Sequence, residues 1–535
     1  MKSMTVKLIL AALVCAGFAA ASIPTIRINT LNNEPLRAIH HQQANNYTFF
    51  YSPMTFQLTD SRNPANNVSR MDFTDSIRGR GNSSWGQDKK PYRVRFSGNR
   101  SSRPSLFGRS PERSWVLLAN VYDSTLVLNT LAFELGRRLG LEYTNSSQFV
   151  HLHFNGVYRG IYQLTEQVQV NPGRVEIDSR WGWLVEFDYH YPPKPKDVDI
   201  YFRTNNFFSG DTLFRLPVFI KSPEELPDLS GYDFVKNDIN RMYDLMIANT
   251  FPENGYRDLM DIDSWVKYIM IQLFMDNHDF NNQSMRVGNR PNPQPGSNFA
   301  YRDFDGKIHA GPLWDFDLSC GITFSMMMRP QHFTTFQRTV MPTHPFYQRF
   351  FDDPVFLARW KKTWDRHLND FRSMPAFIDS LANVLADTIE ANFRIQNLSG
   401  GGGFGGAGRQ LTRQQYMQEK INPLKQWWNN RVNFFDQQIT AMNIDTTLDI
   451  ITTSVYWPHE LSAANKNIRV TGNSINLKAA DKALLKVFTL NGREVRRYNL
   501  SKGNHTVNLN GLPKGIYAVR GRVDGRDVAV RVNLR

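Results

Sequence analysis

Two copies of the tripeptide Asp-Phe-Asp lie twelve positions apart, at residues 303–305 and 315–317. Each copy supplies two carboxylates, the ligand type that binds Mg²⁺ beside phosphate groups. The first copy runs into Gly306, and Asp-Gly between two short apolar runs is typical of a tight hairpin turn. The second copy follows the apolar residues Gly-Pro-Leu-Trp, where strand alternation would place Asp315 and Asp317 on one face. We therefore expect a metal site at the second copy, with capping or ion-paired aspartates as the alternative interpretation.

A second polar cluster, residues 276–282 with the sequence DNHDFNN, follows a predicted helix. An aspartate base, an amide ligand and a later carboxylate pair are the groups that protein kinases assemble for phosphoryl transfer. A plain turn is the alternative interpretation, because Asn and Asp favour loops. The HEXXH, GxSxG and P-loop patterns are absent from the sequence, which argues against the hydrolase and nucleotidase classes that carry them.

The N-terminal residues are typical of a secretory signal peptide. Lys2 and Lys7 precede an apolar run that ends in small residues near position 22, and the run is too short for a membrane anchor. No later segment has the roughly 18 uninterrupted apolar residues that a membrane-spanning helix requires. After removal of residues 1–22 a single cysteine, Cys320, remains, so no internal disulfide can form. We expect a bacterial protein that is secreted or held on the outer cell surface, without a transmembrane segment.

Basic residues exceed acidic ones along the chain. The sequence has 63 Lys and Arg against 49 Asp and Glu, a formal net charge of +14. Between Arg78 and Arg113 the acidic residues are Asp88 and Glu112 alone, so the excess is concentrated in this segment. Such a distribution favours an anionic partner such as phosphate, although a solvated surface is an equally good interpretation for most of these residues. Charge is the only argument for nucleic acid, and we expect no nucleic-acid partner.

The elements around these motifs predict an α+β protein with two or three domains. The first half is a β-rich layer with one main helix at 124–140, which Asp123 can cap and Gly140 can end. The dipeptide Asn155-Gly156 predicts a tight turn between two alternating runs. The second half is helical, and short strands separated by turn residues follow it. The predicted strands of the first half span 92–96, 113–121, 148–168 and 181–191, the predicted helices span 231–248, 261–277, 346–395 and 410–442, and a glycine-rich loop spans 399–409.

Six sequence motifs occur in a fixed order between about residues 70 and 440. They are RGRGNSSWGQDKKPYRVRF, WVLLANVYDSTLVLNTLAFELGRRLG, HFNGVYRGIYQLTEQV, WLVEFD, DNHDFNN and PLWDFDLSCG. In these motifs the chain resembles the spore-coat protein H (CotH) family of atypical, secreted protein kinases. The resemblance implies a kinase-like two-lobed fold over residues 23–445, with a β-rich N-terminal half and a helical C-terminal half. It also implies ATP and Mg²⁺ or Mn²⁺ as cofactors, and transfer of the γ-phosphoryl group to hydroxyl side chains of a protein substrate.

On the N-terminal side, the resemblance implies residues that bind ATP. Lys89 or Lys90 would contact the phosphates, and Glu166 would orient that lysine. The chain lacks the GxGxxG loop of ordinary kinases, and the segment RGRGNSS is its expected replacement. Together with both lysines, the expected cofactor-binding residues are Arg78, Arg80, Ser83, Ser84 and Glu186.

On the C-terminal side, the resemblance implies residues that act on the acceptor hydroxyl and hold the metal. Asp279 would be the catalytic aspartate that accepts the hydroxyl proton. Asn282 would be a metal-binding amide, with Asn281 as its rival because the segment is shorter than is usual in the family. Asp315 would be the metal-binding aspartate, and Asp317 a second metal ligand. The HRD motif of ordinary kinases is absent.

The last part of the chain has a separate resemblance. The segments VFTLNGREV, LNGLPKGIYAVR and VAVRVNL resemble the C-terminal sorting domain of type IX secretion substrates. This resemblance implies a small all-β sandwich over residues 455–535 and the type IX secretion machinery as a partner. Together the two resemblances imply a secreted kinase that acts on surface or extracellular proteins. The alternative is a catalytically inactive cell-surface or carbohydrate-associated scaffold that keeps the same fold.

Overall fold

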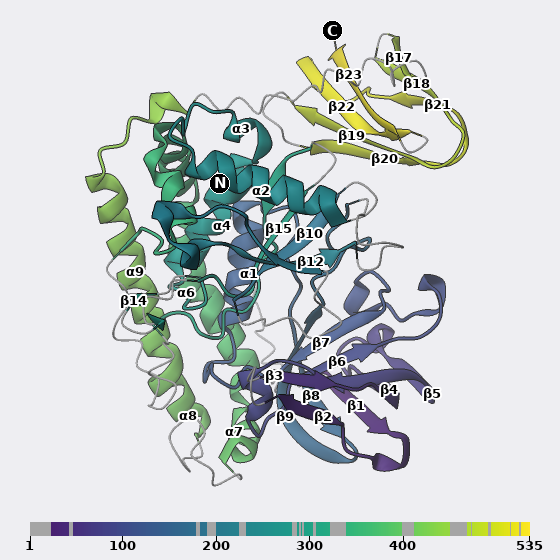
Figure 1. The fold of residues 1–535 in the computed structure, drawn as a ribbon. Coiled ribbons are helices and arrows are strands. Elements are labelled where there is room, and N and C mark those ends of the chain that lie inside the picture. Colours follow the sequence, from purple (N-terminus) through teal and green to yellow (C-terminus); the bar gives the residue numbers. More distant parts are fainter. Residues whose placement is uncertain are drawn as a thin grey trace, which may run out of the picture.

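The computed structural model describes most of the chain from residue 23 to residue 534, and it mixes helix and strand as the sequence predicted. A β-rich part comes first, a part that combines a sheet with long helices follows, and a second β-rich part ends the chain (Figure 1). The expected signal peptide, the glycine-rich loop, the first Asp-Phe-Asp copy, Asn281 and Asn282 lie outside the described residues. The internal gaps are 42–45, 178–181, 190–199, 224–231, 281–285, 288–289, 292–293, 303–305, 322–338, 398–410, 450–467, 472, 490–493, 514 and 524–525.

Seven strands of the N-terminal part form a closed barrel in the order β1-β4-β5-β6-β7-β9-β8. The barrel closes through the parallel pairing of β1 with β8, where Ile28 lies opposite Phe154. Alternating apolar side chains such as Ile26, Ile77 and Val94 are buried inside it, because successive residues of a strand point to opposite faces. The strands are β1 (Thr25–Thr30), β4 (Ser52–Thr59), β5 (Val68–Gly79), β6 (Tyr92–Arg95), β7 (Ser114–Leu118), β8 (Gln148–Phe154) and β9 (Val157–Glu166), and a separate hairpin pairs β2 (Ala38–His41) with β3 (Asn46–Phe49).

Local sequence signals account for the turn between β8 and β9 and for the two ends of helix α1. Asn155 and Gly156 join these strands with φ angles of 49° and 74°, the left-handed values that a tight hairpin turn requires. The α-helix described in this part, α1 (Leu128–Leu139), begins four residues later than predicted. The carboxylate of Asp123 accepts a hydrogen bond from the first helical N–H at 2.9 Å, and Gly140 ends the helix with a φ of 74°.

The middle part is built on an antiparallel sheet in the order β11-β12-β10-β15-β16. β15 and β16 pair antiparallel on either side of the first Asp-Gly dipeptide, with Arg302 opposite Ile308. Helices α4, α6 and α9 pack on one another around the ring of Phe274, and α1 contacts α4 and α6. The strands are β10 (Trp183–Phe187), β11 (Tyr201–Arg203), β12 (Pro217–Ser222), β13 (Arg286–Val287), β14 (Arg290–Pro291), β15 (Asn298–Arg302) and β16 (Ile308–Ala310), and the helices are α2 (Asp233–Ile247), α3 (Tyr256–Leu259), α4 (Ile262–Phe274), α5 (Pro345–Gln348), α6 (Pro354–Ala386), α7 (Ile389–Asn397), α8 (Arg413–Tyr416) and α9 (Asn422–Ala441).

The C-terminal part, at the top right of Figure 1, has a three-stranded sheet and a four-stranded sheet with one shared apolar core. It contacts the segments before β8 and after β9 through charged side chains: Arg497 lies 2.6 Å from Glu176, and Lys486 lies 3.6 Å from Glu142. Over the described ranges, no helix is both long and apolar enough to cross a membrane. The strands are β17 (Ile468–Thr471), β18 (Ser474–Ala479), β19 (Ala483–Thr489), β20 (Glu494–Leu500), β21 (Gly503–Asn508), β22 (Gly515–Val523) and β23 (Arg526–Leu534).

A buried histidine at the start of α5 makes the folded state sensitive to acid. The Nδ1 atom of His344 accepts a hydrogen bond from the backbone N–H of Phe346 at 3.2 Å, and burial lowers the pKa of His344 from 6.5 to about 3. Between these two pH values the unfolded chain binds the proton and the folded chain does not. The free energy of unfolding therefore falls as the pH falls, by up to about 1.4 kcal/mol per pH unit from this residue.

We expect His344→Asn to flatten this dependence, because Asn can still cap the helix and does not titrate. Urea denaturation between pH 7 and pH 4.5 should show a shallower loss of stability in the variant than in the wild type. His505→Asn, a change at a partly exposed position of β21, is the matched control and should keep the wild-type slope. Equal slopes in the wild type and His344→Asn would contradict the prediction.

Candidate active site

A cleft of about 350 Å³ lies between the barrel and the five-stranded sheet. Its walls come from the end of β5 and the loop that follows, from β10 and β12, from the segment after α4 and from the segment after β16. The structure thereby brings together parts of the chain that are far apart in sequence. The predicted site residues that line the cleft are Arg78, Arg80, Ser83, Ser84, Glu186, Asp279, Asp315 and Asp317.

The second Asp-Phe-Asp copy presents both of its carboxylates to this cleft. Asp315 and Asp317 line it, whereas Phe316 between them is fully buried. The backbone N–H of Phe316 donates to Oδ1 of Asn129 on α1 at 2.8 Å, and Oγ of Ser297 donates to Oδ2 of Asp315 at 3.1 Å. Asp315 also has a φ of 64°, a left-handed conformation that is uncommon outside glycine and that turns the chain at this point. These contacts hold the two carboxylates on one face although the segment is not a strand.

Asp279 reaches the same cleft from the segment that follows α4. The backbone N–H of His278 donates to the carbonyl of Leu318 at 2.9 Å, and that of Cys320 donates to the carbonyl of Met275 at 2.6 Å. These two bonds hold the Asn-His-Asp segment beside the second Asp-Phe-Asp copy. Burial lowers the pKa of His278 to about 4, so its ring is neutral at physiological pH and adds no positive charge next to Asp279.

The carboxylates of the cleft are close enough to affect one another. Burial raises the pKa of Asp317, and the negative charges of Asp315 and Asp279 raise it further, while Arg80 lowers it. A bound cation relieves such crowding. In the part of the chain that the structure describes, no three His, Cys, Asp or Glu side chains are grouped as a metal site. Mg²⁺ is often held by one or two carboxylates together with phosphate oxygens, so the pair fits a metal ion that binds with a nucleotide.

The sequence did not predict an ion pair between β10 and β12, the two neighbouring strands on the sheet side of the cleft. Nζ of Lys221 on β12 lies 3.0 Å from Oε2 of Glu186 on β10, and both residues line the cleft. Burial raises the pKa of Glu186, and the nearby charge of Lys221 opposes that shift. Lys221 is the one charged residue of β12, and a single lysine within a buried, mainly apolar strand is the signal that could have pointed to it.

The end of β5 and the start of the loop that follows it, residues 79–86, form the rim of the cleft on the barrel side and are called the rim loop. Gly81 has a φ of 83°, and a Cβ atom there would lie 2.2 Å from Oγ of Ser84, so the turn requires glycine. The guanidinium of Arg80 lies 5.4 Å from the ring centre of Trp314, which directly precedes the second Asp-Phe-Asp copy. The rim is therefore positioned against the carboxylate side.

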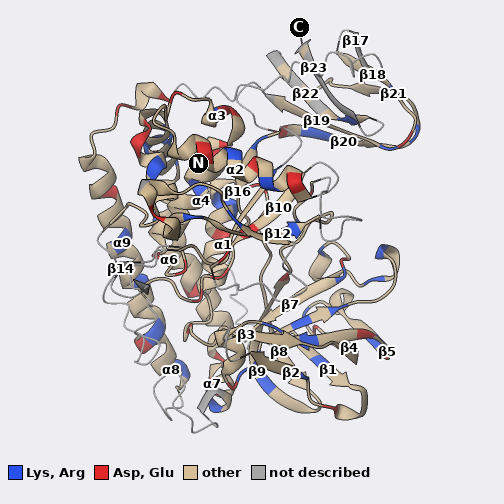
Figure 2. Cartoon of the chain, in the orientation of Figure 1, with Lys and Arg blue, Asp and Glu red and all other residues tan. Residues whose placement is uncertain are grey.

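Cationic side chains line the barrel side of the cleft. Arg78 on β5 and Arg93 on β6 face it, and both belong to the basic segment between Arg78 and Arg113. Figure 2 shows this part of the barrel with blue Lys and Arg segments. Apart from Lys221, which pairs with Glu186, the cleft thus has its cations on the barrel side and its carboxylates on the other.

The predicted pair of Lys89 and Glu166 is not formed among the described residues. Lys89 is buried, and its Nζ donates to the carbonyl oxygens of Ala119 at 2.9 Å and Ile161 at 2.6 Å. Burial lowers the pKa of Lys89 to about 7. Glu166 accepts hydrogen bonds from the backbone N–H and the hydroxyl of Ser146 at 2.7 and 2.6 Å. Each side chain satisfies its polar atoms with partners of its own, and neither lines the cleft.

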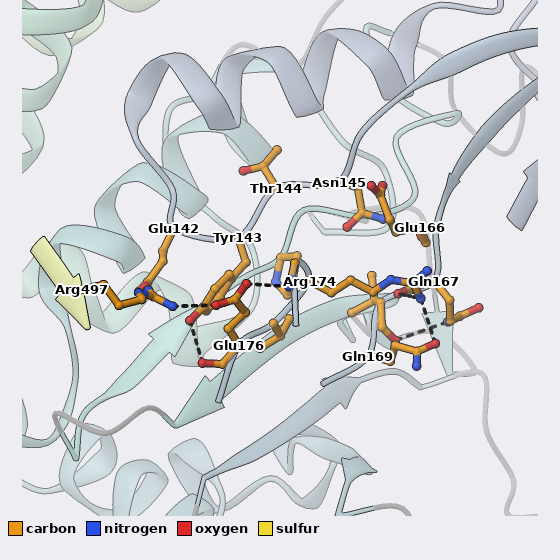
Figure 3. Close-up of a pocket in the computed structure, with 14 residues that line it drawn as sticks. Glu142, Tyr143, Thr144, Asn145, Glu166, Gln167, Gln169, Arg174, Glu176 and Arg497 are labelled. Atoms are coloured by element: carbon orange, nitrogen blue, oxygen red, sulfur yellow. Dashed lines mark hydrogen bonds and ion pairs between the residues drawn. The ribbon is translucent and has the colours of Figure 1, made fainter. Parts of the chain in front are cut away.

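Lys90 and Glu166 lie at two other places in the fold. Nζ of Lys90 donates to the carbonyl of Trp85 at 2.7 Å and so supports the rim loop. Glu166 lines a second cavity of about 460 Å³ next to the C-terminal part (Figure 3). Arg174 and Arg497 line this cavity as well, and Figure 3 shows Arg497 reaching in from the C-terminal part. Neither Lys90 nor Glu166 lines the cleft.

Comparison with known protein families gives two matches. Residues 77–435 match the family described as CotH kinase protein, and residues 467–532 match the secretion system C-terminal sorting domain. None of the curated proteins matches the chain. Both family matches confirm the resemblances that the motifs indicated, and the sorting domain implies export to the cell surface or the extracellular space. Because the first match covers more than half of the chain, the protein belongs to the CotH kinase protein family.

Proposed function

We propose that this protein is a secreted protein kinase that transfers the γ-phosphoryl group of ATP to hydroxyl side chains of surface or extracellular proteins. The observation that carries the proposal is the division of charge in the cleft, with Asp279, Asp315 and Asp317 on one side and Arg78 and Arg80 on the other. Phosphoryl transfer uses cations to bind the phosphates and a carboxylate to act on the acceptor. In this proposal the barrel is one lobe of a kinase-like fold, and the middle part, with its sheet and long helices, is the other.

The phosphates of ATP would bind on the cationic side. Arg78 and Arg80 would contact phosphate oxygens, and the hydroxyl groups of Ser83 and Ser84 would donate further hydrogen bonds. Asp315 and Asp317 would hold Mg²⁺ or Mn²⁺, which neutralises phosphate charge when it is bound. Charge-assisted hydrogen bonds of this kind are stronger than those between neutral groups, so the cleft can orient a triphosphate.

We assign the lysine and glutamate of the kinase mechanism to Lys221 and Glu186 instead of Lys89 and Glu166. The 3.0 Å ion pair fixes the amine of Lys221 inside the cleft, where it can bind phosphate. The amine of Lys89 already donates to two carbonyl oxygens outside the cleft. The geometry therefore favours Lys221 as the phosphate-binding lysine.

Asp279 would act on the acceptor hydroxyl. Its side chain lines the cleft and is only 8% exposed, so its carboxylate is screened from bulk water. As the hydroxyl oxygen forms a bond to the γ-phosphorus, the bond to the leaving ADP oxygen breaks and Asp279 accepts the hydroxyl proton. The products are a phosphorylated side chain and ADP.

The C-terminal part supports the extracellular setting of this activity. Its two sheets share one buried core, the arrangement expected of a small β-sandwich. In the proposal the type IX secretion machinery recognises this part and exports the chain. The substrates are then proteins at the cell surface or beyond it.

Label transfer from ATP tests the proposal directly. The purified protein, incubated with γ-labelled ATP, Mg²⁺ or Mn²⁺ and a generic protein acceptor, should label itself or the acceptor. We expect Lys221→Met to lower the initial rate by about 100-fold, because one positioned cation at the phosphates is lost. Lys236→Met on α2, a partly exposed lysine outside the cleft, is the matched control and should keep the wild-type rate. A wild-type protein that neither binds ATP nor transfers label would overturn the proposal in favour of the inactive scaffold.

A further inference from the structure

A β-hairpin outside the family match contributes to the cleft. Strands β2 and β3 precede residue 77, where the match to the CotH kinase protein family begins. Tyr47 and Phe49 of β3 nevertheless line the cleft, next to Arg78 and the rim loop. Figure 1 shows this hairpin beside the barrel strands. The wall of the cleft therefore includes a segment that the family match leaves out.

β3 packs closely on the rim loop. The ring of Phe49 lies 5.0 Å from the ring of Trp85 in an edge-to-face arrangement, and the guanidinium of Arg78 lies 5.6 Å from the centre of the Phe49 ring. A Cβ atom at Gly79 would lie 2.5 Å from Trp85 and 2.7 Å from Phe49, so glycine is needed for this contact. Tyr47 stacks on Phe49 with ring centres 5.9 Å apart. Phe49 thus touches both a cleft arginine and the aromatic residue of the loop.

The rim loop needs such support because of its composition. Gly79, Gly81 and Gly86 lie within eight residues, and glycine loses more conformational entropy on ordering than any other residue. A loop that is only partly ordered in the free protein weakens binding in proportion to the fraction of molecules that are competent to bind. Nζ of Lys90 donates a hydrogen bond to the backbone carbonyl of Trp85 at 2.7 Å, and the ring of Phe49 packs edge-to-face on the Trp85 ring.

We propose that the β2–β3 hairpin positions the rim loop, residues 79–86, for the phosphates of ATP, and that Phe49 is the positioning residue. The inference rests on the proposed function, because it assigns the hairpin a part in nucleotide binding. Phe49 acts through Trp85 and Arg78 and not on the reacting atoms. Its removal should therefore affect the binding of ATP and leave the chemical step intact.

Phe49→Ala is expected to raise the Kd and the KM for ATP by about tenfold, the size of effect that an aromatic contact of this kind supports. The kcat at saturating ATP should stay at the wild-type value. Phe49→Tyr, which keeps the ring, should restore wild-type binding. Phe50→Ala is the matched control, because the Phe50 ring is exposed and contacts Arg37 at 5.3 Å instead of the loop.

Hydrogen exchange of the loop amides in the ATP-free protein provides a readout that does not depend on activity. Faster exchange in residues 79–86 of Phe49→Ala, with unchanged exchange in the other barrel strands, supports the inference. Equal exchange and equal Kd in the wild type and Phe49→Ala would overturn it while leaving the proposed function in place. A loss of kcat as large as the rise in KM would also overturn it, since that result indicates general disruption. A wild-type protein that binds no ATP would overturn the proposed function and the inference together.

Discussion

Asp279→Asn and Asp315→Asn are expected to suppress phosphoryl transfer in two different ways. For Asp279→Asn we expect kcat to fall by about 10²–10⁴-fold with little change in the KM for ATP, because an amide cannot accept the hydroxyl proton. For Asp315→Asn we expect weaker binding of ATP with its metal ion as well, because one carboxylate ligand is lost. Initial rates of label transfer, measured across ATP and metal concentrations, separate the two effects.

A remote aspartate provides the control for this experiment. Asp365 on α6 is half exposed and pairs with Lys361 at 2.5 Å, and it does not line the cleft. Asp365→Asn should therefore transfer label at the wild-type rate. If Asp279→Asn and Asp315→Asn also kept the wild-type rate, the reaction would not use this cleft and the proposed function would fail.

Asp353→Ala is expected to lower the free energy of unfolding by about 3 kcal/mol. Asp353 is fully buried at the start of α6 and accepts hydrogen bonds from the backbone N–H of Val355 at 2.9 Å and from the hydroxyl of Tyr256. It also forms an ion pair with Arg257 at 2.7 Å. Removing the carboxylate leaves the partly buried guanidinium of Arg257 with less negative charge beside it. The same change removes the N-terminal cap of α6. Urea denaturation measures the loss as a lower midpoint at an unchanged slope.

The neighbouring Asp352 is the matched control for this prediction. It pairs with Arg349 at 2.9 Å, but its side chain is 60% exposed, and exposed ion pairs contribute about 0–1 kcal/mol. Asp352→Ala should therefore change the free energy of unfolding by less than about 1 kcal/mol. Equal destabilisation by the two variants would show that burial of Asp353 is not the decisive factor.

Short-range patterns in the sequence were sufficient for several features of this protein. The dipeptide Asn155-Gly156 predicts the hairpin between β8 and β9, because both residues adopt positive φ angles readily. Gly140 predicts the end of α1 for the same reason. Strand alternation predicts a shared face for Asp315 and Asp317, and both line the cleft although the segment is not a strand. The motifs also identified the family, which the match over residues 77–435 confirms.

The sequence placed most of the candidate site but not its ion pair. Arg78, Arg80 and Asp315 could be proposed because they lie within recognisable motifs, and each lines the cleft. Lys89 lies in the same motif as Arg80 and was an equally reasonable candidate. In the structure the amine of Lys89 donates to two backbone carbonyl oxygens, because a buried amine needs hydrogen-bond acceptors.

Only the tertiary structure decided which lysine and which glutamate meet in the cleft. Lys221 and Glu186 are 35 residues apart and come together because β10 and β12 pair side by side. In the same way, the hydrogen bond from the backbone N–H of Phe316 to Asn129 joins residues 187 positions apart and holds the segment that carries Asp315 and Asp317. Local sequence patterns encode turns, caps and the faces of single strands, since these depend on neighbouring residues. Which strands become neighbours, and therefore which charges become partners, depends on the burial of the whole core.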